Sequence, residues 1–439
     1  MMERETTINF SIKTLGECTI PAPLTVGYFK SDDERILYDI SVKGIEDHVL
    51  KDTQITSFEV AGPRRKVFFD PSKVKAAIVT CGGLCPGIND VIRALVMELY
   101  YRYGVRNIIG IRYGFQGLIP DYGHDVIELD PEIVKDIHML GGSFLSCSRG
   151  NQDVGAMVDA LERMNISILF CIGGDGTMRG AELITEEIGK RQKRIGVVGI
   201  PKTIDNDIMI IEKSFGFDTA IQEAVKVIQC AHVEAKGAPN GVGLVKLMGR
   251  QSGHIAASAA LAQGDANFVL IPEIPFDLEG EKGFLPTLER RLRDRHHAVI
   301  LAAEGAGQDL LHRNGVPIRT DPSGNVRLAD IGLFLKERIE EYSKQRGMEV
   351  NLKYIDPGYT IRSVVANASD GLYCGMLAKY AVHAAMAGKT GMVVGLVNNT
   401  YVHLPLRAVA SRRKMVDPNG NIWMNVLEST GQPASLKND

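Results

Sequence analysis

From Lys75 onward, short apolar runs alternate with longer helical patterns, and this alternation constrains the fold more than any other feature of the chain. The runs are continuously apolar and rich in β-branched residues, as expected of strands that are buried on both faces. The expected strands are Ala76–Thr80, Asn107–Ile111, Ile166–Ile172, Ile195–Ile200, Val242–Leu247, Asn267–Ile271, Ala298–Ala303 and Met392–Val397. The pattern predicts an α/β protein with parallel-rich sheets covered by helices.

Between these runs, apolar positions recur three and four residues apart, which is typical of amphipathic helices. The expected helices are Asn89–Tyr103, Met178–Lys190, Thr219–His232, Ser252–Ala262, Ile331–Lys344 and Gly371–Ala387. A chain of 439 residues is too long for one ordinary core, so we expect two or three domains. Such an organisation leaves room for a cleft between lobes.

The two ends of the chain lack this alternation. The first 70 residues carry mixed charge and scattered prolines, and we interpret them as an extension that packs on the core or on a neighbouring subunit. The tail after Asp417 is polar and is expected to be loosely held. We find neither a signal-peptide pattern at the N-terminus nor a run of 18 apolar residues, so we expect neither secretion nor membrane spanning.

Charge and cysteine content restrict the partners and the compartment. Lys and Arg total 50 against 53 Asp and Glu, which gives no electrostatic reason to expect nucleic acid or a membrane surface as a partner. The seven scattered cysteines are typical of a reduced, intracellular protein, and we expect a cytoplasmic location. Cys81 and Cys85 form the only close pair, but no second pair follows at zinc-site spacing, so we interpret them as small residues in a tight turn.

The first loop with a chemical signature is Cys81–Gly87, between an expected strand and an expected helix. A glycine-rich turn of this kind presents backbone N–H groups and the positive end of a helix dipole to an anion. It lacks Lys-Ser or Lys-Thr after Gly87, so it is not a Walker A loop. It predicts a phosphate site, with a turn that serves only packing as the alternative.

A stronger signal is Gly173–Thr177, which reads Gly-Gly-Asp-Gly-Thr and follows the strand Ile166–Ile172. Its glycines let triphosphate oxygens approach the main chain, and Asp175 can hold a hydrated Mg²⁺ that bridges those oxygens. The loop therefore predicts a nucleotide kinase that uses Mg²⁺. The alternative is an ordinary turn in which Asp175 caps the next helix.

Pro201–Asp207 follows the strand Ile195–Ile200 and contains two carboxylates two residues apart. One of them can accept a hydroxyl proton while the other supports the metal or a cation, and Asp205 is our candidate general base. The alternative is a polar loop in which both acids cap backbone groups.

Two more polar side chains follow expected strands, at carboxyl ends where open α/β sheets bind ligands. Met248-Gly249-Arg250 follows Val242–Leu247, and Glu304 follows Ala298–Ala303. Arg250 is a candidate cation for a phosphate or for the transition state, and Glu304 a candidate acceptor for sugar hydroxyls. A structural ion pair is the alternative for either side chain.

Together these motifs resemble the 6-phosphofructokinase family. The matching segments are Gly82-Gly83, Pro86–Asn89, Gly141–Leu145, Gly173–Thr177, Pro201–Asp207 and Met248–Arg250, in the family's order. The resemblance covers roughly Lys75 to Gly395. It implies two Rossmann-like lobes, one for nucleotide and one for fructose 6-phosphate, with the active site in the cleft between them.

The resemblance also implies a division of the chain and a set of site residues. The expected parts are an N-terminal extension (1–70), a nucleotide-binding lobe (71–213), a fructose 6-phosphate-binding lobe (214–390) and a C-terminal segment (391–439), and we expect the chain to cross back between the lobes. ATP contacts are implied at Gly83, Arg149, Gly150, Gly174, Asp175, Gly176 and Thr177, with Mg²⁺ at Asp175. Catalytic roles are implied for Asp205, Arg250 and Thr203. Sugar-phosphate contacts are implied at Thr203, Asp205, Met248, Gly249, Arg250, Glu304, Lys353, Tyr359 and Arg362.

Two positions depart from the short bacterial enzymes of the family. Lys353 stands where those enzymes carry Arg, so a point charge replaces a planar fork. Gly241, nine residues before Arg250, replaces another basic residue, and the cross-subunit phosphate contact carried there loses its cation.

The choice of phosphoryl donor rests on Gly176 and Lys202. Pyrophosphate-using relatives carry Asp at the first position, where a carboxylate would crowd and repel the α-phosphate of ATP, whereas Lys202 is the residue that those relatives carry. We give Gly176 more weight, because a clash excludes ATP while an added lysine is compatible with either donor. The combination resembles the long ATP-dependent branch of plants, trypanosomatids and some bacteria.

The resemblance therefore implies a glycolytic, allosteric, ATP-dependent enzyme that forms a homotetramer or a dimer and phosphorylates the 1-hydroxyl of fructose 6-phosphate. Alternatives are a pyrophosphate-dependent enzyme and a non-catalytic regulatory subunit. A different kinase is a further alternative, because NAD and lipid kinases share Gly-Gly-Asp-Gly-Thr.

Overall fold

The computed structural model describes residues 9–25, 27–50, 55–313, 319–320 and 326–438. Contacts divide the chain into two compact units. The first takes the described residues up to Thr203 together with Ile208–Phe215 and Val365–Arg412, and the second takes Ile204–Asp207, Gly216–Val364 and Arg413 onward. The chain thus crosses repeatedly between the units.

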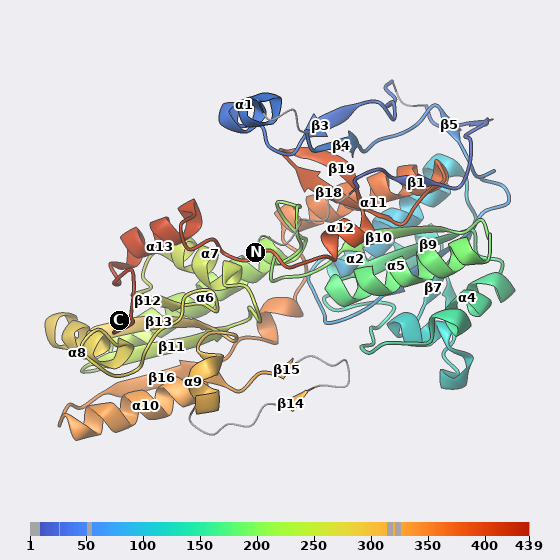
Figure 1. Ribbon diagram of the computed structural model, residues 1–439. Coiled ribbons are helices and arrows are strands. Elements are labelled where there is room, and N and C mark those ends of the chain that lie inside the picture. Colours follow the sequence, from blue (N-terminus) through green and yellow to red (C-terminus); the bar gives the residue numbers. More distant parts are fainter. Residues whose placement is uncertain (1–8, 26, 51–54, 314–318, 321–325, 439) are drawn as a thin grey trace. The chain divides into compact units, whose positions relative to one another are not determined.

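Within the described residues, the first unit holds a nine-stranded sheet in the order β3-β4-β19-β18-β10-β9-β6-β7-β8 (Figure 1). Its strands are β3 (Arg35–Leu37), β4 (Ser57–Val60), β6 (Lys75–Thr80), β7 (Asn107–Ile111), β8 (Val126–Glu128), β9 (Ile168–Gly173), β10 (Gly196–Pro201), β18 (Met392–Val397) and β19 (Thr400–Pro405). The central strands β18, β10, β9, β6 and β7 run parallel, and each coincides with an expected strand. The prediction of a parallel-rich sheet is confirmed here.

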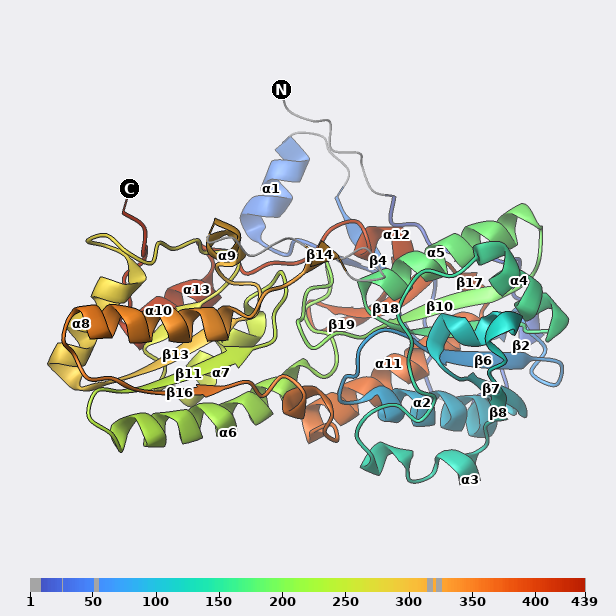
Figure 2. The same cartoon turned by 90° about the horizontal axis from the view of Figure 1, so that it is seen from below.

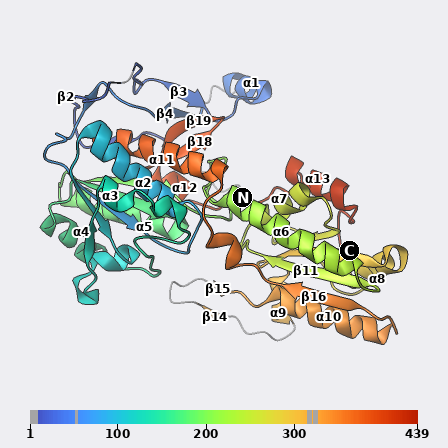
Figure 3. The same cartoon turned by 180° about the vertical axis from the view of Figure 1, so that it is seen from behind.

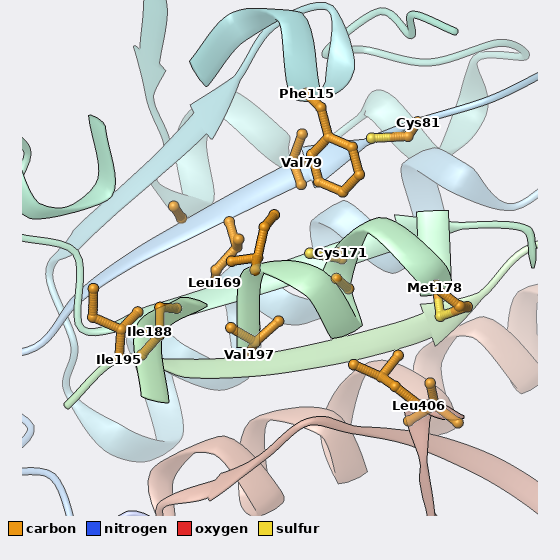
Figure 4. Close-up of a cluster of buried hydrophobic side chains, with 14 of the residues drawn as sticks. Val79, Cys81, Phe115, Leu169, Cys171, Met178, Ile188, Ile195, Val197 and Leu406 are labelled. Atoms are coloured by element: carbon orange, nitrogen blue, oxygen red, sulfur yellow. The ribbon is translucent and has the colours of Figure 1, made fainter. Parts of the chain in front are cut away.

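Helices cover both faces of this sheet. Its longer helices are α2 (Ile88–Met97), which continues into the π-helical segment η1 (Glu98–Tyr103), and α4 (Val154–Arg163), α5 (Asp175–Lys190) and α11 (Ala368–Met386). Figure 4 shows the core beneath α5, where Leu169, Cys171 and Val197 from the strands meet Met178 and Leu406. These strand residues have no exposed face, which explains their continuously apolar sequence.

The expected N-terminal extension is built into the first unit. Strands β3 and β4 join the nine-stranded sheet through an antiparallel pairing of β4 with β19. Glu59 of β4 is buried and accepts hydrogen bonds from Arg64 (2.7 Å) and His403 (2.8 Å), and Lys389 lies 2.7 Å from it. The extension therefore packs on the core of its own chain. The remaining elements of this unit are β1 (Lys13–Thr14), β2 (Ile20–Pro21), α1 (Val42–Leu50), β5 (Lys66–Val67), η2 (Gly114–Leu118), η3 (Pro120–Tyr122), α3 (Pro131–Val134), η4 (Ile137–Met139), β17 (Lys389–Thr390) and α12 (Leu406–Val409).

The second unit, in its described part, holds a four-stranded parallel sheet in the order β12-β13-β11-β16. Its strands are β11 (Gly241–Leu247), β12 (Phe268–Leu270), β13 (His297–Ala303) and β16 (Asn351–Ile355). Helices α6 (Phe217–Lys236) and α7 (His254–Gln263) cover one face, and α8 (Phe284–Arg295) and α10 (Ile331–Gln345) cover the other (Figures 2 and 3). The shorter elements are α9 (Gln308–Arg313), β14 (Arg319–Thr320), β15 (Val326–Arg327) and η5 (Thr360–Arg362).

The prediction that the tail after Asp417 is loosely held is wrong. Helix α13 (Asn421–Thr430) buries Trp423 and Val426, and Leu436 joins the core of the second unit. The side chain of Gln432 accepts a hydrogen bond from the backbone N of Val269 at 2.7 Å and donates one to its carbonyl at 3.4 Å. The tail is otherwise polar. It is held to the second unit by a few apolar residues and by one side-chain amide that pairs with the edge strand β12.

Within the described residues, no helix combines the length and the apolar character that a bilayer span requires.

Candidate active site

The glycine-rich loops of the first unit follow two adjacent parallel strands. From β6 the chain moves to β7 on one side and later to β9 and β10 on the other, so its direction across the sheet reverses between β6 and β9. Ligands of open α/β sheets bind at such a switch point, outside the carboxyl ends of the strands. The fold therefore brings Cys81–Gly87 and Gly174–Thr177 to one edge of the sheet.

The glycine turn after β6 is anchored on both sides. Gly82 has φ of 87°, in the left-handed region that favours glycine, and its N–H donates to the carbonyl of Ser148 at 3.0 Å. From β10, the ammonium of Lys202 donates to the carbonyl of Gly83 at 2.6 Å, and only 4% of Lys202 is exposed. Lys202 thus takes a structural part in the turn that the sequence did not predict.

The segment that carries Arg149 and Gly150 lies beside the same turn. Thr80, the last residue of β6, donates its hydroxyl to the carbonyl of Ser146 at 2.6 Å. The side chain of Asn89 donates to Leu140 O at 2.9 Å and accepts from the N–H of Phe144 at 2.7 Å. These bonds hold the segment against the start of α2, and the side chain of Arg149 remains exposed.

Asp175 is the first residue of α5, and the N-cap is Gly174. The structure therefore differs from the alternative in which Asp175 caps this helix. The carboxylate forms an ion pair with Arg179 one turn further on and is 18% exposed. A Cβ placed on Gly176 would meet no atom within 4 Å, so open space adjoins the loop, whereas Thr177 is buried.

Sequence reasoning missed Arg112 and Tyr113, which follow β7 at the same sheet edge. Within the described part of the chain, the buried Nε of Arg112 has no hydrogen-bond partner. Tyr113 has φ of 57°, and its N–H donates to Leu145 O at 3.0 Å. Their position directly after the predicted strand Asn107–Ile111 was the available signal, because the carboxyl ends of parallel strands share one edge.

The paired carboxylates of the third loop belong to the second unit, whereas Thr203 belongs to the first, where its carbonyl accepts from Ser214 Oγ at 2.6 Å. Burial raises the pKa of Asp205 to about 8, and the negative charges of Asp207 and Glu304 add to the effect. A carboxyl with such a pKa is a stronger base than an ordinary carboxylate, and it accepts a proton once the pH is high enough to ionise it. Asp205 therefore remains our candidate general base.

Arg250 and Glu304 follow β11 and β13, which are adjacent in the sheet. Their loops are joined by hydrogen bonds from Glu304 N to Leu247 O (2.8 Å) and from Gly305 N to Gly249 O (3.1 Å). Burial raises the pKa of Glu304, while the charges of Arg250, Lys246 and Arg362 oppose that rise. One carboxyl and three cations are therefore gathered at the carboxyl ends of β13, β11 and β16.

The loop after β16 carries Tyr359 and Arg362. The guanidinium carbon of Arg362 lies 4.9 Å from the centre of the exposed Tyr359 ring. Its buried Nε has no hydrogen-bond partner among the described residues, as expected of a side chain that awaits an anionic ligand. Lys246, which sequence reasoning missed, lies 2.7 Å from Asp330 and 2.8 Å from Asp356, and so holds the start of this loop.

Lys353 and Gly241 differ from the other predicted positions. Lys353 lies in the middle of the edge strand β16 with an exposed side chain, and in the described chain no hydrogen bond or ion pair joins it to Arg250, Glu304 or Arg362. A Cβ on Gly241 would lie 2.0 Å from the carbonyl oxygen of Ala235 in α6. The close approach of this helix explains why no basic side chain can stand there.

Cysteine and carboxylate placement bears on metal binding. Among the described residues, no group of three or more His, Cys, Asp or Glu could hold a metal ion. Burial raises the pKa of the Cys81 thiol to about 12, and Cys85 Sγ donates to Phe215 O at 3.2 Å, so neither is a ready thiolate ligand. Mg²⁺ commonly uses one or two carboxylates together with waters and substrate phosphates, and Asp175 fits that simpler requirement.

Comparison with known sequences finds close relatives along the whole chain. A family model described as phosphofructokinase matches residues 75–385. An ATP-dependent 6-phosphofructokinase of Borreliella burgdorferi is 51% identical over 98% of this chain and 98% of its own length. The ATP-dependent 6-phosphofructokinase 7 of Arabidopsis thaliana is 50% identical over 86% of this chain and 78% of its own. An ATP-dependent 6-phosphofructokinase of Entamoeba histolytica is 43% identical over 94% of this chain and 93% of its own length.

Solved structures share the fold at lower identity. A pyrophosphate-dependent phosphofructokinase from Marinobacter aquaeolei superposes with a TM-score of 0.66 over 82% of this chain and 91% of its own, at 20% identity. The T-state phosphofructokinase of Pichia pastoris gives 0.64 over 83% of this chain and 37% of its own, at 22% identity. At these identities the likeness concerns the fold alone.

Proposed function

This chain belongs to the phosphofructokinase family, and on that premise we propose that it transfers the γ-phosphoryl group of ATP to the 1-hydroxyl of fructose 6-phosphate. The products are fructose 1,6-bisphosphate and ADP, so the enzyme serves glycolysis. Relatives that are 43 to 51% identical and match nearly end to end carry the name ATP-dependent 6-phosphofructokinase, which supports this assignment.

The observation that carries the proposal is the environment of Asp205. One oxygen of its carboxylate is buried, and burial together with the negative charges of Asp207 and Glu304 raises its pKa to about 8. A kinase that phosphorylates an alcohol needs an acceptor for the hydroxyl proton, and positioning accounts for most of the remaining rate enhancement. A loop built only to cap backbone groups would not need this environment.

In the proposed mechanism, Asp205 accepts the proton of the sugar 1-hydroxyl as that oxygen attacks the γ-phosphorus in line. Arg250 offsets the charge that develops on the transferring group, together with backbone N–H groups of the glycine loops. Thr203 helps to orient the attacking hydroxyl. ATP is held by Gly83, Arg149, Gly150 and the loop Gly174–Thr177.

Asp175 would hold the Mg²⁺, in line with its position at the carboxyl end of β9 and its partial exposure. When bound, the ion neutralises phosphate charge and holds the triphosphate in one geometry. The Arg179 guanidinium, which pairs with Asp175 in the structure, keeps the carboxylate oriented along the first turn of α5.

Fructose 6-phosphate is held by residues of the second unit. Glu304 accepts hydrogen bonds from sugar hydroxyls, and Arg362, whose Nε has no partner in the described chain, donates to the 6-phosphate. Tyr359, Met248 and Gly249 line the sugar. Lys353 remains a proposed phosphate contact, and its exposed side chain is the support.

The donor in this proposal is ATP, because the open space beside Gly176 leaves room for the nucleotide. The deciding experiment measures fructose 1,6-bisphosphate formation by the purified protein with Mg²⁺, comparing ATP and pyrophosphate side by side. Turnover with ATP alone is expected. Turnover with pyrophosphate alone would mean that Lys202 decides the donor, and activity only after addition of a partner subunit would favour a regulatory role.

A homo-oligomer, a tetramer or a dimer, and a cytoplasmic location complete the proposal. Family membership supports the first, and the seven free cysteines support the second. Sedimentation velocity of the purified protein tests the assembly.

A further inference from the structure

A segment near the end of the chain contacts the loop that carries the two carboxylates. The backbone N–H of Lys414 donates to the carbonyl of Asp207 at 2.8 Å, and its ammonium donates to Asn206 Oδ1 at 2.9 Å. A guanidinium nitrogen of Arg413 lies 3.7 Å from the carboxylate of Asp207. All these residues belong to the second unit. Lys414 and Asn206 are 208 positions apart in the sequence, so this contact exists only in the folded chain.

Lys414 binds Asn206, a residue with an uncommon backbone conformation. Asn206 has φ of 52°, in the left-handed region, and it separates Asp205 from Asp207. Asparagine visits this region more readily than most residues, yet the conformation persists only where surrounding contacts fix it. Because Asn206 lies between the two acids, its backbone angles set the directions of both carboxylates.

A second tether holds the same segment. The N–H of Val416 donates to Glu273 Oε1 at 2.8 Å, and the same carboxylate accepts from the N–H of Gly253 at 2.9 and 3.1 Å. The neighbouring Ser252 donates its hydroxyl to the carbonyl of Asp205 at 3.4 Å. Glu273 therefore connects the segment to a strand-end loop that itself contacts Asp205.

We propose that Lys414, supported by Arg413, is a positioning residue that fixes Asn206 and so aims the carboxylate of Asp205 at the hydroxyl it deprotonates. Lys414 touches no reacting atom in this role and acts only through Asn206 and Asp207. The inference rests on the proposed function and deepens it, because it adds the segment Arg413–Val416 to the machinery of the same site.

The test compares Lys414→Met with Lys414→Arg and with Arg412→Gln in the full-length enzyme. Arg412 is an exposed cation two residues earlier for which no contact with the loop is found in the described chain, so its variant is the matched control. Lys414→Met should lower kcat by about 10- to 100-fold, because small misplacements of a reacting group are costly. KM for both substrates should change by less than about twofold, and Lys414→Arg, which keeps a cationic donor, should recover much of kcat.

A double-mutant cycle tests the route of the effect. In an Asn206→Ala background the amide acceptor is gone, so Lys414→Met should cost little more than Asn206→Ala alone. Additive losses, or a Lys414→Met enzyme with the kcat of Arg412→Gln, would overturn the proposal.

Hydrogen exchange separates a failure of this inference from a failure of the proposed function. Backbone amides of residues 204–207 should exchange faster in Lys414→Met than in wild type, whether or not the protein phosphorylates fructose 6-phosphate. If the wild type does not phosphorylate fructose 6-phosphate but exchange is still faster in Lys414→Met, the proposed function is refuted and the positioning role of Lys414 is retained. If the wild type is active but residues 204–207 exchange equally fast in wild type and Lys414→Met, the positioning role of Lys414 is refuted.

Discussion

The ammonium of Lys202 donates a hydrogen bond to the carbonyl oxygen of Gly83 at 2.6 Å, and so ties the end of β10 to the glycine turn after β6. Lys202 is buried, and its ammonium lies 3.6 Å from where a Cβ on Gly82 would stand. A lysine that fixes the glycine turn has the same structural role whether the phosphates bound at that turn belong to ATP or to pyrophosphate. Its presence is therefore compatible with ATP.

Lys202→Met should loosen the glycine turn without changing the donor. Loss of one charge-assisted hydrogen bond, worth about 1.5–3 kcal/mol, should lower kcat/KM for ATP by about 10- to 100-fold. Steady-state kinetics with each substrate varied in turn should show a smaller change in KM for fructose 6-phosphate. A gain of pyrophosphate turnover in this variant would contradict the structural role.

Gly176→Asp should fold normally and lose ATP. A Cβ at this position meets no atom within 4 Å, so the new side chain should cause no clash within the protein. Its carboxylate would repel the nucleotide phosphates, and kcat/KM for ATP should fall by about 100-fold or more. Gly176→Asn is the matched control, because it has the same size without the charge. If Asn costs as much as Asp, crowding and not repulsion excludes the nucleotide.

Asp205→Ser should leave binding of fructose 6-phosphate measurable by calorimetry while lowering kcat by about 10² to 10⁴, the usual effect of removing a general base. The pKa of Asp205 is raised to about 8, mainly by burial, and the base must be ionised to act. The kcat/KM of the wild type for fructose 6-phosphate should therefore fall as the pH drops below about 8. A variant with near-normal kcat would remove Asp205 from the mechanism.

His383 should make the first unit less stable at acid pH. Its Nδ1 lies 2.8 Å from the Tyr103 hydroxyl, and burial lowers the pKa of the imidazole to about 4 from 6.5. A group with a lowered folded-state pKa stabilises the fold above its unfolded pKa and loses that contribution as the pH falls from 6.5 toward 4. The full loss is about 3 kcal/mol.

The matching measurement is urea denaturation of wild type and His383→Gln at pH 7.5 and pH 5. The variant cannot take up this proton, so its free energy of unfolding should change less between the two pH values. If the free energy of unfolding changes by the same amount between pH 7.5 and pH 5 in both proteins, His383 does not cause the acid sensitivity.

The central strands could be predicted because they are buried on both faces and therefore read as unbroken apolar runs. Strand β16 escaped prediction because it is an edge strand with an exposed Lys353, and β19 because the buried His403 interrupts its apolar run. The tail was misjudged because its apolar anchors, Trp423 and Leu436, are few and far apart.

The candidate site could be predicted where its chemistry is local. Glycine loops and the pair Asp205 and Asp207 are visible as short motifs after strands. Lys246 and Lys414 were missed because their partners lie 84 and 208 positions away, and no local pattern marks a lysine whose partner is that distant. Arg112 was missed because it lies outside any glycine motif.

The bonds from Gln432 to Val269 also have a consequence for how this protein behaves in a crowded solution. An edge strand with unpaired N–H and C=O groups is a template on which another chain can add a strand and begin to aggregate. One side-chain amide occupies both groups of Val269 and denies them to a neighbour. The C-terminal tail thus covers the β12 edge of the second sheet, which should disfavour self-association through that edge.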